Sequence, residues 1–255
     1  MSDPVTELVK AHLKQLRLPA MARELERLSR EAAASDQNYE QFLLRLADEE
    51  LAARSANARE GRIKDAAFPV AKDFDTYDFA AMPALSRPKV LELALCAWID
   101  QKFNCCFVGS TGTGKTHLAT ALGLAACRRG LRVRFFTAAA LVSKLEQAQK
   151  QYTLDRLLGQ LNRAELLILD ELGYVSFSRN GVELLFRLLT ARYERSSVLI
   201  TSNLAFADWA QVFQGERMTA ALLDRLCHHC HIFEMNGESY RFRESMKTKK
   251  GRKAE

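Results

Sequence analysis

The sequence lacks the features that would place the protein in a membrane or send it out of the cell. All of its apolar runs are far shorter than the roughly 20 residues that a membrane-spanning helix needs. The first residues show no basic stretch followed by an apolar run, so they do not resemble a signal peptide. Internal repeats are also absent. We therefore expect a cytoplasmic protein that binds no membrane.

The sequence also lacks a cysteine pattern that would indicate disulfides or a complete metal site. The sequence has six cysteines, but disulfides are rare in a reducing compartment. The stretch 227–231 reads Cys-His-His-Cys-His, which is half of a zinc site. A structural zinc site needs a second pair of ligands at a suitable spacing, and none is nearby. Cys105 and Cys106 lie in an apolar run where small buried residues are expected. We expect neither disulfides nor structural zinc.

What the sequence does contain is a phosphate-binding loop. Residues 109–116 read Gly-Ser-Thr-Gly-Thr-Gly-Lys-Thr and fit the pattern G-x-x-x-x-G-K-[ST] at every fixed position. An apolar run, 105–108, precedes the loop and a helical pattern, 117–122, follows it, which is the strand–loop–helix context that the motif requires. Lys115 is then expected at the β- and γ-phosphates, and the Thr116 hydroxyl on Mg²⁺. The expected ATP-binding residues are Gly109, Ser110, Thr111, Gly112, Thr113, Gly114, Lys115, Thr116 and His117.

Two acidic residues follow a second apolar run. Residues 166–169 are four apolar residues in a row, which predicts a strand buried on both faces of a parallel sheet. Asp170 and Glu171 come directly after it, at the edge where open α/β sheets bind ligands. We expect Asp170 to hold Mg²⁺ and Glu171 to orient or deprotonate the attacking water.

Two further strands complete the predicted sheet. Residues 132–136 predict a strand, and Thr137 is a suitable N-cap for the helix after it. Another apolar strand, 197–203, ends on polar residues, so Asn203 is expected at the same edge as Asp170. There it could contact the γ-phosphate or the water, although a turn residue after a strand is an equally good interpretation.

Together with 223–226, Leu-Asp-Arg-Leu, these motifs resemble the Walker A, Walker B, sensor 1 and arginine-finger motifs of AAA+ ATPases, in that order. Within that class the chain is most similar to the IstB proteins, which are ATP-dependent helpers of IS21-type transposases. The DnaC-type helicase loaders come next. The likeness runs from about residue 8 to about residue 246. The phrases that carry it are 16–21, 77–79, 169–174, 218–226 and 237–241.

The resemblance implies an α/β fold: a P-loop AAA+ ATPase with a parallel sheet, without a full helical lid, after a small all-α N-terminal domain. Helical spacing, prolines and aromatic residues suggest a helical domain at 1–65 and a linker at 66–86 that packs on the ATPase. The ATPase then occupies 87–246 and a basic tail 247–255. Whether Arg241 or Arg243 replaces an arginine of the missing lid stays open.

The resemblance also implies a homo-oligomer in which Arg225 reaches the ATP site of a neighbouring subunit. An intrachain salt bridge from Arg225 to Asp224 or Glu216 is the alternative. The implied activity is ATP hydrolysis coupled to assembly on double-stranded DNA, with recruitment or activation of a cognate transposase.

Charge is compatible with a DNA partner. The formal net charge is +6, which favours a polyanion without requiring one. Arg128, Arg129, Arg132 and Arg134 flank a strand start on the side away from the nucleotide, so we interpret them as ordinary surface residues. For any single basic residue, an ordinary solvated surface position is the better interpretation, and only as a set do the candidates below suit phosphate contacts. Besides the tail, the candidate DNA contacts are Arg54, Arg59, Arg62, Lys64, Lys144, Lys150 and Arg156.

Three other functions compete with the transposition helper. A DnaC-like helicase loader has the same motor motifs, so these motifs cannot separate the two. A small-molecule P-loop kinase is disfavoured by the Asp-Glu pair and by the late Leu-Asp-Arg motif. A DNA-architectural protein that binds ATP without hydrolysing it is disfavoured by Glu171.

Overall fold

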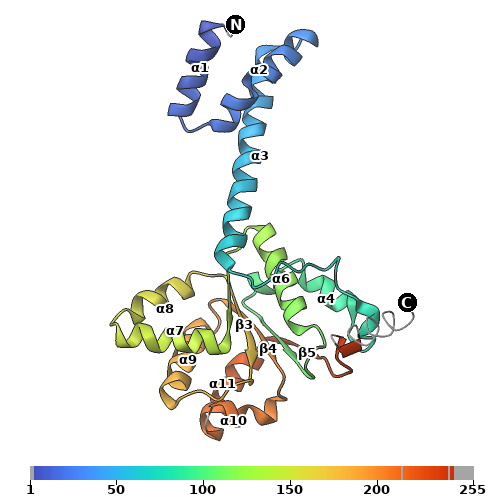
Figure 1. The fold of residues 1–255 in the computed structure, drawn as a ribbon, viewed down its shortest axis with the longest axis vertical. Coiled ribbons are helices and arrows are strands. Elements are labelled where there is room, and N and C mark those ends of the chain that lie inside the picture. The colour runs from blue at the N-terminus through green and yellow to red at the C-terminus, as the bar shows by residue number, and fades with distance from the viewer. Residues whose placement is uncertain (1–2, 214, 241, 244–255) are drawn as a thin grey trace, which may run out of the picture. The chain divides into compact units, whose positions relative to one another are not determined.

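The chain forms two compact units in the computed structural model, Met1–Gly61 and Arg62–Glu255. Residues 3–213, 215–240 and 242–243 are described. The first unit is made of helices (Figure 1): α1 (Pro4–Gln15), α2 (Pro19–Ala34) and α3 (Tyr39–Ala66), which continues into the second unit. Among the described residues, no helix is both long and apolar enough to cross a bilayer.

Proline and acidic side chains define where the first helices begin. The Asp3 carboxylate accepts a hydrogen bond from the Val5 N–H, and a proline occupies the first turn of both α1 and α2. Glu50 of α3 is buried and accepts from the backbone N–H groups of Ala20 and Met21 at 2.8 and 3.2 Å. This carboxylate satisfies donors that α2 cannot satisfy itself. The small core beneath it is formed by Met21, Leu28 and Leu46.

A five-stranded sheet forms the centre of the second unit, with the order β2-β3-β4-β1-β5 and every neighbouring pair parallel. Parallel strands need crossover connections, and helices supply most of them. The strands are β1 (Asn104–Val108), β2 (Val133–Thr137), β3 (Leu166–Leu172), β4 (Ser197–Ser202) and β5 (Cys230–Glu234). The helices are α4 (Arg87–Leu93), α5 (Ala97–Asp100), α6 (Lys115–Arg129), α7 (Ala138–Lys150), α8 (Leu154–Asn162), α9 (Arg179–Arg192), α10 (Ala210–Phe213) and α11 (Glu216–Cys227), with short 3₁₀ turns η1 (Phe79–Ala81) and η2 (Phe206–Trp209).

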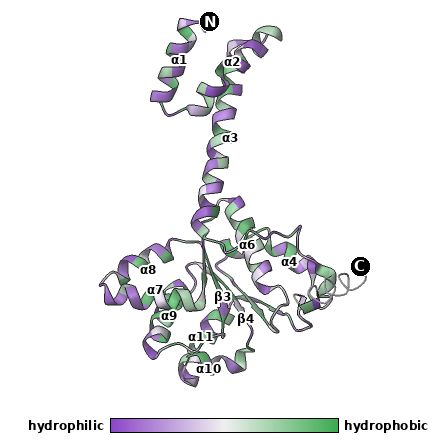
Figure 2. Cartoon of the chain, in the orientation of Figure 1, coloured by the Kyte–Doolittle hydropathy of each residue, from purple (hydrophilic) through white to green (hydrophobic). Residues whose placement is uncertain are grey.

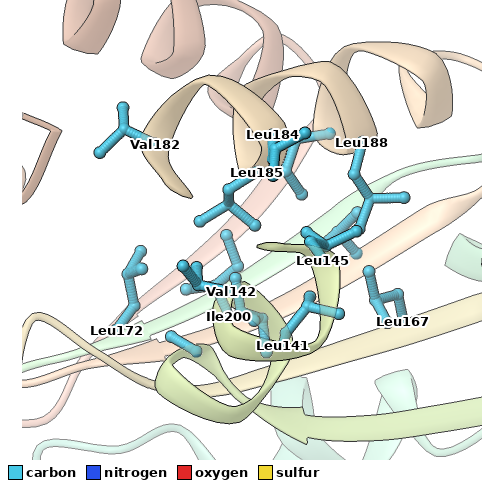
Figure 3. Packing of buried hydrophobic residues seen from close by; sticks show 14 of the residues in the cluster. Leu141, Val142, Leu145, Leu167, Leu172, Val182, Leu184, Leu185, Leu188 and Ile200 are labelled. Atoms are coloured by element: carbon cyan, nitrogen blue, oxygen red, sulfur yellow. The ribbon is translucent and has the colours of Figure 1, made fainter. Parts of the chain in front are cut away.

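Helices cover both faces of this sheet, so alternate strand residues enter different cores. On one face, Leu167 packs with Leu141 of α7 and Leu185 of α9 (Figure 3). On the other face, Ile168 packs with Leu118 of α6. Burial on both faces explains why the central strands β1, β3 and β4 contain continuous apolar runs. In Figure 2, α7 and α9 carry both hydrophobic and hydrophilic residues, as expected of helices with one buried side.

The fold class expected from the sequence is confirmed: a parallel sheet with helices on both faces, preceded by a helical segment. Thr137 caps α7 as predicted, accepting from the Ala140 N–H. Two details differ. β3 does not end before the acidic pair but continues through Asp170 and Glu171 to Leu172, with a shift in its register against β4. The sequence also gave no sign of β5, whose cysteine and histidines suggested half of a zinc site.

A buried arginine in α9 connects this helix to α8 and β4 through hydrogen bonds. The Arg192 side chain at the end of α9 donates to the carbonyl oxygens of Leu161 (2.8 Å), Ala164 (3.0 Å) and Ser197 (2.9 Å). Burial lowers the pKa of Arg192 to about 10, so the guanidinium stays charged at neutral pH. The carbonyl dipoles at the end of α8, just after it and at the start of β4 offset this charge.

Replacing Arg192 by Met should lower the free energy of unfolding by about 3 kcal/mol or more, because three buried carbonyl oxygens lose their donor. Urea unfolding followed by circular dichroism measures the change. The matched control is Arg187→Met on the same helix, where an exposed arginine pairs with Asp155 at 2.9 Å. The Arg187→Met change should lower the free energy of unfolding by less than about 1 kcal/mol. Equal losses in the two variants would show that Arg192 does not hold these elements together.

Candidate functional site

A cleft of about 670 Å³ opens at the carboxyl ends of β3 and β4, beside the loop that follows β1. Its size lies within the roughly 300–1,000 Å³ of small-molecule sites, and its position is where open α/β sheets bind ligands. The segment before α4 and the residues after β5 form its remaining walls. The residues of the predicted site that line it are Thr111, Gly112, Thr113, Gly114, Lys115, Thr116, His117, Asp170, Glu171 and Asn203.

The loop between β1 and α6 has a shape that requires glycine at three positions, and two of them, Gly112 and Gly114, line the cleft. Gly112 and Gly114 have φ angles of +81° and +92°, in the left-handed region that other residues avoid. A Cβ atom on Gly112 would lie 2.1 Å from the Ser239 hydroxyl, and one on Gly114 would lie 2.8 Å from the Tyr77 ring. Backbone conformation and close packing therefore both exclude a side chain at these positions.

Lys115 begins α6 and places its ammonium group inside the curve of the loop. Its Nζ atom donates to the carbonyl oxygens of Gly109 and Ser110 at 2.7 and 2.6 Å. Gly109 and Ser110 do not line the cleft, but they belong to the site because their carbonyl oxygens bind the Lys115 ammonium. A buried ammonium at a helix N-terminus concentrates positive charge, which suits a phosphate group.

Two oxygen-bearing side chains meet beside the loop. The Thr116 hydroxyl donates to the Asp170 carboxylate, 2.9 and 3.0 Å from its two oxygens. Asp170 is only 2% exposed although it belongs to the lining of the cleft. Hydroxyl and carboxylate oxygens are ligands that Mg²⁺ prefers. These two residues therefore fit a magnesium ion held next to nucleotide phosphates.

Glu171 and Asn203 face the same cleft from neighbouring strands. The Glu171 side chain is exposed, while its backbone has a φ of +60° and its N–H donates to the Thr201 hydroxyl at 3.0 Å. The Oδ1 atom of Asn203 is buried and makes no hydrogen bond to any described residue. A buried polar atom normally has a partner, so this atom fits a polar ligand or a water in the cleft.

The segment before α4 packs against the loop. The Tyr77 ring lies edge-on to the His117 ring at 5.1 Å between centroids, and its hydroxyl donates to the Thr113 carbonyl at 3.4 Å. Burial raises the pKa of Tyr77 to about 12, so the phenol keeps the proton that it donates. His117 contacts the carbonyl oxygen of Asp73 through Nε2 at 2.7 Å. This part of the predicted linker is thus a wall of the cleft.

Residues after β5 also pack against the loop. The Tyr240 N–H donates to the Gly112 carbonyl at 2.9 Å. Arg243 lines the cleft, where it donates to the Ala81 carbonyl at 3.0 Å and lies 3.7 Å from Glu238. Its role as a substitute for a lid arginine stays a prediction. Arg241 and the tail 247–255 lie outside the described residues.

The sequence did not identify three residues of this site. Tyr77 and Tyr240 belong to the phrases 77–79 and 237–241 that carry the family resemblance, but neither fits a general phosphate or metal motif. That resemblance was the only signal for them. Thr201 belongs to the strand end Thr-Ser-Asn that resembles sensor 1, but nothing in the sequence indicates that its hydroxyl contacts the acidic pair.

Arg225 lies on α11 and does not line the cleft of its own chain. Its guanidinium donates to the Ala221 carbonyl at 2.7 Å and lies over the Phe186 ring, 5.6 Å from the centroid. Within the described ranges it forms no ion pair with Asp224 or Glu216, the partners that the alternative interpretation required. The structure therefore keeps Arg225 apart from the other predicted catalytic residues.

The candidate DNA contacts fall into two groups. Arg54 is engaged within the first unit by Glu50 and by the Arg17 carbonyl, and Arg62 donates to the Cys127 carbonyl within the second. Lys144 lies over the Phe136 ring. The candidates that are exposed and form no ion pair with a described residue are Arg59, Lys64, Lys144, Lys150 and Arg156.

The four arginines interpreted as ordinary surface residues behave differently. Each lies within 4.0 Å of an acidic side chain: Arg128 of Asp73, Arg129 of Asp100, Arg132 of Glu165 and Arg134 of Asp65. Local acids thus balance their charge, which leaves less of it for a phosphate backbone.

Within the described part of the chain, no cysteine of the stretch 227–231 belongs to a group of three donors close enough together to hold one metal ion. A hydrogen bond with Cys230 and complete burial raise the pKa of the Cys106 thiol, and burial raises that of Cys227 to about 11. Among the described residues, the one group with suitable donor spacing is an exposed trio without cysteine: Glu194, His228 and His229.

Solved structures of replication proteins share this fold. The crystal structure of the DnaC helicase loader is 22% identical and superimposes with a TM-score of 0.53, covering 64% of this chain and 96% of that one. The AMPPCP-bound DnaA of Aquifex aeolicus is 20% identical with a TM-score of 0.57, covering 71% of this chain and 56% of that one. These likenesses establish an AAA+ type of fold.

Closer relatives are proteins of insertion sequences. The ATP-binding protein of IS21 from Pseudomonas aeruginosa is 39% identical over 235 residues, which are 92% of this chain and 89% of that protein. The ATP-binding protein of IS5376 from Geobacillus stearothermophilus is 36% identical over 238 residues, 93% of this chain and 95% of that protein. A family model described as IstB-like ATP binding protein matches residues 11–248. With the loop, the acidic pair and the helical N-terminal segment all in place, this chain belongs to the IstB-like family of ATP-binding proteins.

Proposed function

We propose that this protein hydrolyses ATP with Mg²⁺, assembles as a homo-oligomer on double-stranded DNA, and recruits or activates the transposase of its insertion sequence. The observation that carries the proposal is the junction of Lys115, Thr116 and the pair Asp170–Glu171 in one cleft. Its biological context rests on relatives that are named as insertion-sequence proteins and that align with more than nine tenths of this chain.

Binding of ATP is assigned to the loop and its neighbours. The N–H groups at the start of α6 and the Lys115 ammonium bind the phosphates, because both bring positive charge to the same concave surface. Thr116 and Asp170 hold Mg²⁺, which neutralises charge on the β- and γ-phosphates. Tyr77 and His117 close the cleft on the side of the linker.

Hydrolysis is assigned to Glu171 and Asn203. The Glu171 carboxylate is exposed to the cleft beside the buried Asp170, so it can accept a proton from a water while Asp170 stays with the metal. The Asn203 amide, whose Oδ1 has no hydrogen bond to a described residue, orients the water or the γ-phosphate.

Arg225 is assigned to the site of a neighbouring subunit. It lies outside the cleft of its own chain and has carbonyl and aromatic partners rather than an acid. Such an arginine keeps its charge available for another molecule. Stabilisation of the transferring phosphoryl group by an arginine finger raises the rate by about 10³ to 10⁵. Hydrolysis would then require assembly.

DNA binding is assigned to the exposed basic residues of α3, α7 and α8. Lys64, Lys150 and Arg156 are exposed and form no ion pair with a described residue, in contrast to the arginines 128–134 that acids balance. Contacts of this type bind phosphates and position the protein without reading bases. DNA affinity should therefore fall steeply with salt.

A helicase loader is the second candidate, because the DnaC structure has the same fold. The extent of the similarity favours the transposition helper. The insertion-sequence relatives align with 92% and 93% of this chain, whereas the DnaC structure covers 64%. A transposase gene beside the gene of this protein, and co-purification with that transposase rather than with a replicative helicase, would separate the two functions.

Gly114→Ala should weaken ATP binding by about tenfold or more, because a side chain there would displace Tyr77 and strain the loop. Titration with a fluorescent ATP analogue measures this. Gly130→Ala is the matched control: its φ is also left-handed, at +102°, but a Cβ atom would contact nothing within 4 Å. Gly130→Ala should cost roughly 1–2 kcal/mol of stability through its backbone alone, Gly114→Ala should cost more, and only Gly114→Ala should change nucleotide affinity. Unchanged affinity in Gly114→Ala would contradict the assignment of the loop.

Glu171→Gln should bind ATP like the parent but release phosphate about 10²-fold more slowly or worse, because the amide cannot accept a proton from water. Its complexes with long duplex DNA should therefore persist in ATP, as electron microscopy and salt-dependent anisotropy can record. Glu183→Gln on α9, an exposed acid paired with Arg179, is the control. Parental turnover in Glu171→Gln would exclude it as the base. If ATP does not change DNA binding by the parent, the DNA part of the proposal is wrong.

Arg225→Ala should bind ATP nearly as well as the parent and hydrolyse it poorly. Mixing it with Lys115→Ala should restore some activity, because mixed assemblies contain interfaces that join an intact loop to an intact arginine. Phosphate release over a range of ratios measures this recovery, with crosslinking to verify that mixed oligomers form. Arg217→Ala, an exposed position on the same helix, should behave like the parent. If mixed oligomers form and no activity returns, Arg225 acts within its own chain or only in packing.

A further inference from the structure

β3 contains a bulge at the acidic pair. In its pairing with β4, Leu169 lies opposite Ile200 and Leu172 lies opposite Ser202. Two residues of β3, Asp170 and Glu171, therefore share the space of a single residue of β4, which is Thr201. Bulges of this kind occur next to active sites, where they change the direction of a side chain.

The bulge explains how both acids reach one cleft. Adjacent residues of a regular strand point to opposite faces of the sheet. Here Glu171 adopts a left-handed φ of +60°, and both Asp170 and Glu171 line the cleft. A left-handed conformation costs a non-glycine residue roughly 1–2 kcal/mol, so surrounding contacts must hold it.

The Thr201 hydroxyl supplies such a contact to both acids. It accepts a hydrogen bond from the Glu171 backbone N–H at 3.0 Å and donates one to Asp170 Oδ1 at 2.5 Å. A hydroxyl has one proton to donate and two lone pairs, so it can do both at once. Thr201 is 2% exposed, which keeps water from competing for these bonds.

We propose that Thr201 is a positioning residue for Mg²⁺-dependent ATP hydrolysis: its hydroxyl holds the Asp170 carboxylate and the Glu171 backbone in one arrangement. The inference rests on the proposed function. Asp170 also accepts from the Thr116 hydroxyl, but the oxygen of Thr116 is itself assigned to the metal. Thr201 has no such second task, so it orients the carboxylate whatever Thr116 does. Residues that orient a metal ligand typically change metal affinity by 10–100-fold when removed.

The test compares Thr201→Val, which keeps the branched shape without the hydroxyl, with Thr201→Ser, which keeps the hydroxyl. The first readout is affinity for a fluorescent ATP analogue across a Mg²⁺ titration and in EDTA. In Thr201→Val the Mg²⁺ midpoint should rise about 10–100-fold while the affinity in EDTA changes little. The second readout is phosphate release at saturating Mg²⁺, which should fall because Glu171 is no longer held. Thr201→Ser should match the parent in both.

Thr190→Val is the matched control. It makes the same chemical change in α9 of the same unit, at a buried hydroxyl that makes no hydrogen bond to a described residue. Its Mg²⁺ midpoint should equal that of the parent. If Thr201→Val does not fold, Thr201→Cys replaces it, because a thiol is a poor donor of similar size. It should raise the midpoint while Thr201→Ser does not.

Either of two results would overturn the inference about Thr201 and leave the proposed function standing. One is a Thr201→Val protein with an unchanged Mg²⁺ midpoint. The other is a Thr201→Val protein that loses nucleotide affinity equally with and without Mg²⁺. The second result would make Thr201 a packing residue. A parent protein whose nucleotide affinity does not respond to Mg²⁺ would overturn the proposed function and this inference with it. The parental titration therefore distinguishes the two failures.

Discussion

The carboxylate of Asp170 is the group on which the arrangement of the cleft depends. It is almost fully buried, and it accepts hydrogen bonds from Thr116 at the start of α6 and from Thr201 in β4. An unpaired buried carboxylate is strongly destabilising, so the loop, β3 and β4 can be stable in this arrangement only together. The chemistry and the stability of the sheet edge therefore rest on the same contacts.

Around this junction the cleft is built from segments outside the sheet. The linker contributes Tyr77, which contacts Thr113, and the stretch after β5 contributes Tyr240, which contacts Gly112. Each tyrosine makes a hydrogen bond to a main-chain carbonyl of the loop, and the Tyr77 ring also packs against Gly114. One charged group assigned to catalysis, Arg225, stays apart from the cleft. Under the proposed function, a single chain carries the nucleotide cleft, and a neighbouring subunit supplies the arginine that completes the catalytic site.

Much of this could be predicted from the sequence, because local patterns determine it. The loop at 109–116 fits a motif whose spacing reflects phosphate geometry, and the apolar runs predict buried parallel strands. The bulge could not be predicted, since it depends on the register between β3 and β4. The same holds for Thr201 and Tyr77, whose roles come from residues distant in the sequence. β5 was missed because its polar residues conceal a strand at the sheet edge.

The buried guanidinium of Arg192 has a consequence for how this fold can vary. Its three acceptors are main-chain carbonyl oxygens, which every amino acid provides. The residues at 161, 164 and 197 can therefore change as far as their own packing allows, while the arginine they bind cannot be exchanged so freely. An interaction of this kind produces no correlated substitutions between positions. It would be invisible to methods that infer contacts from covariation, although it joins two helices to a central strand.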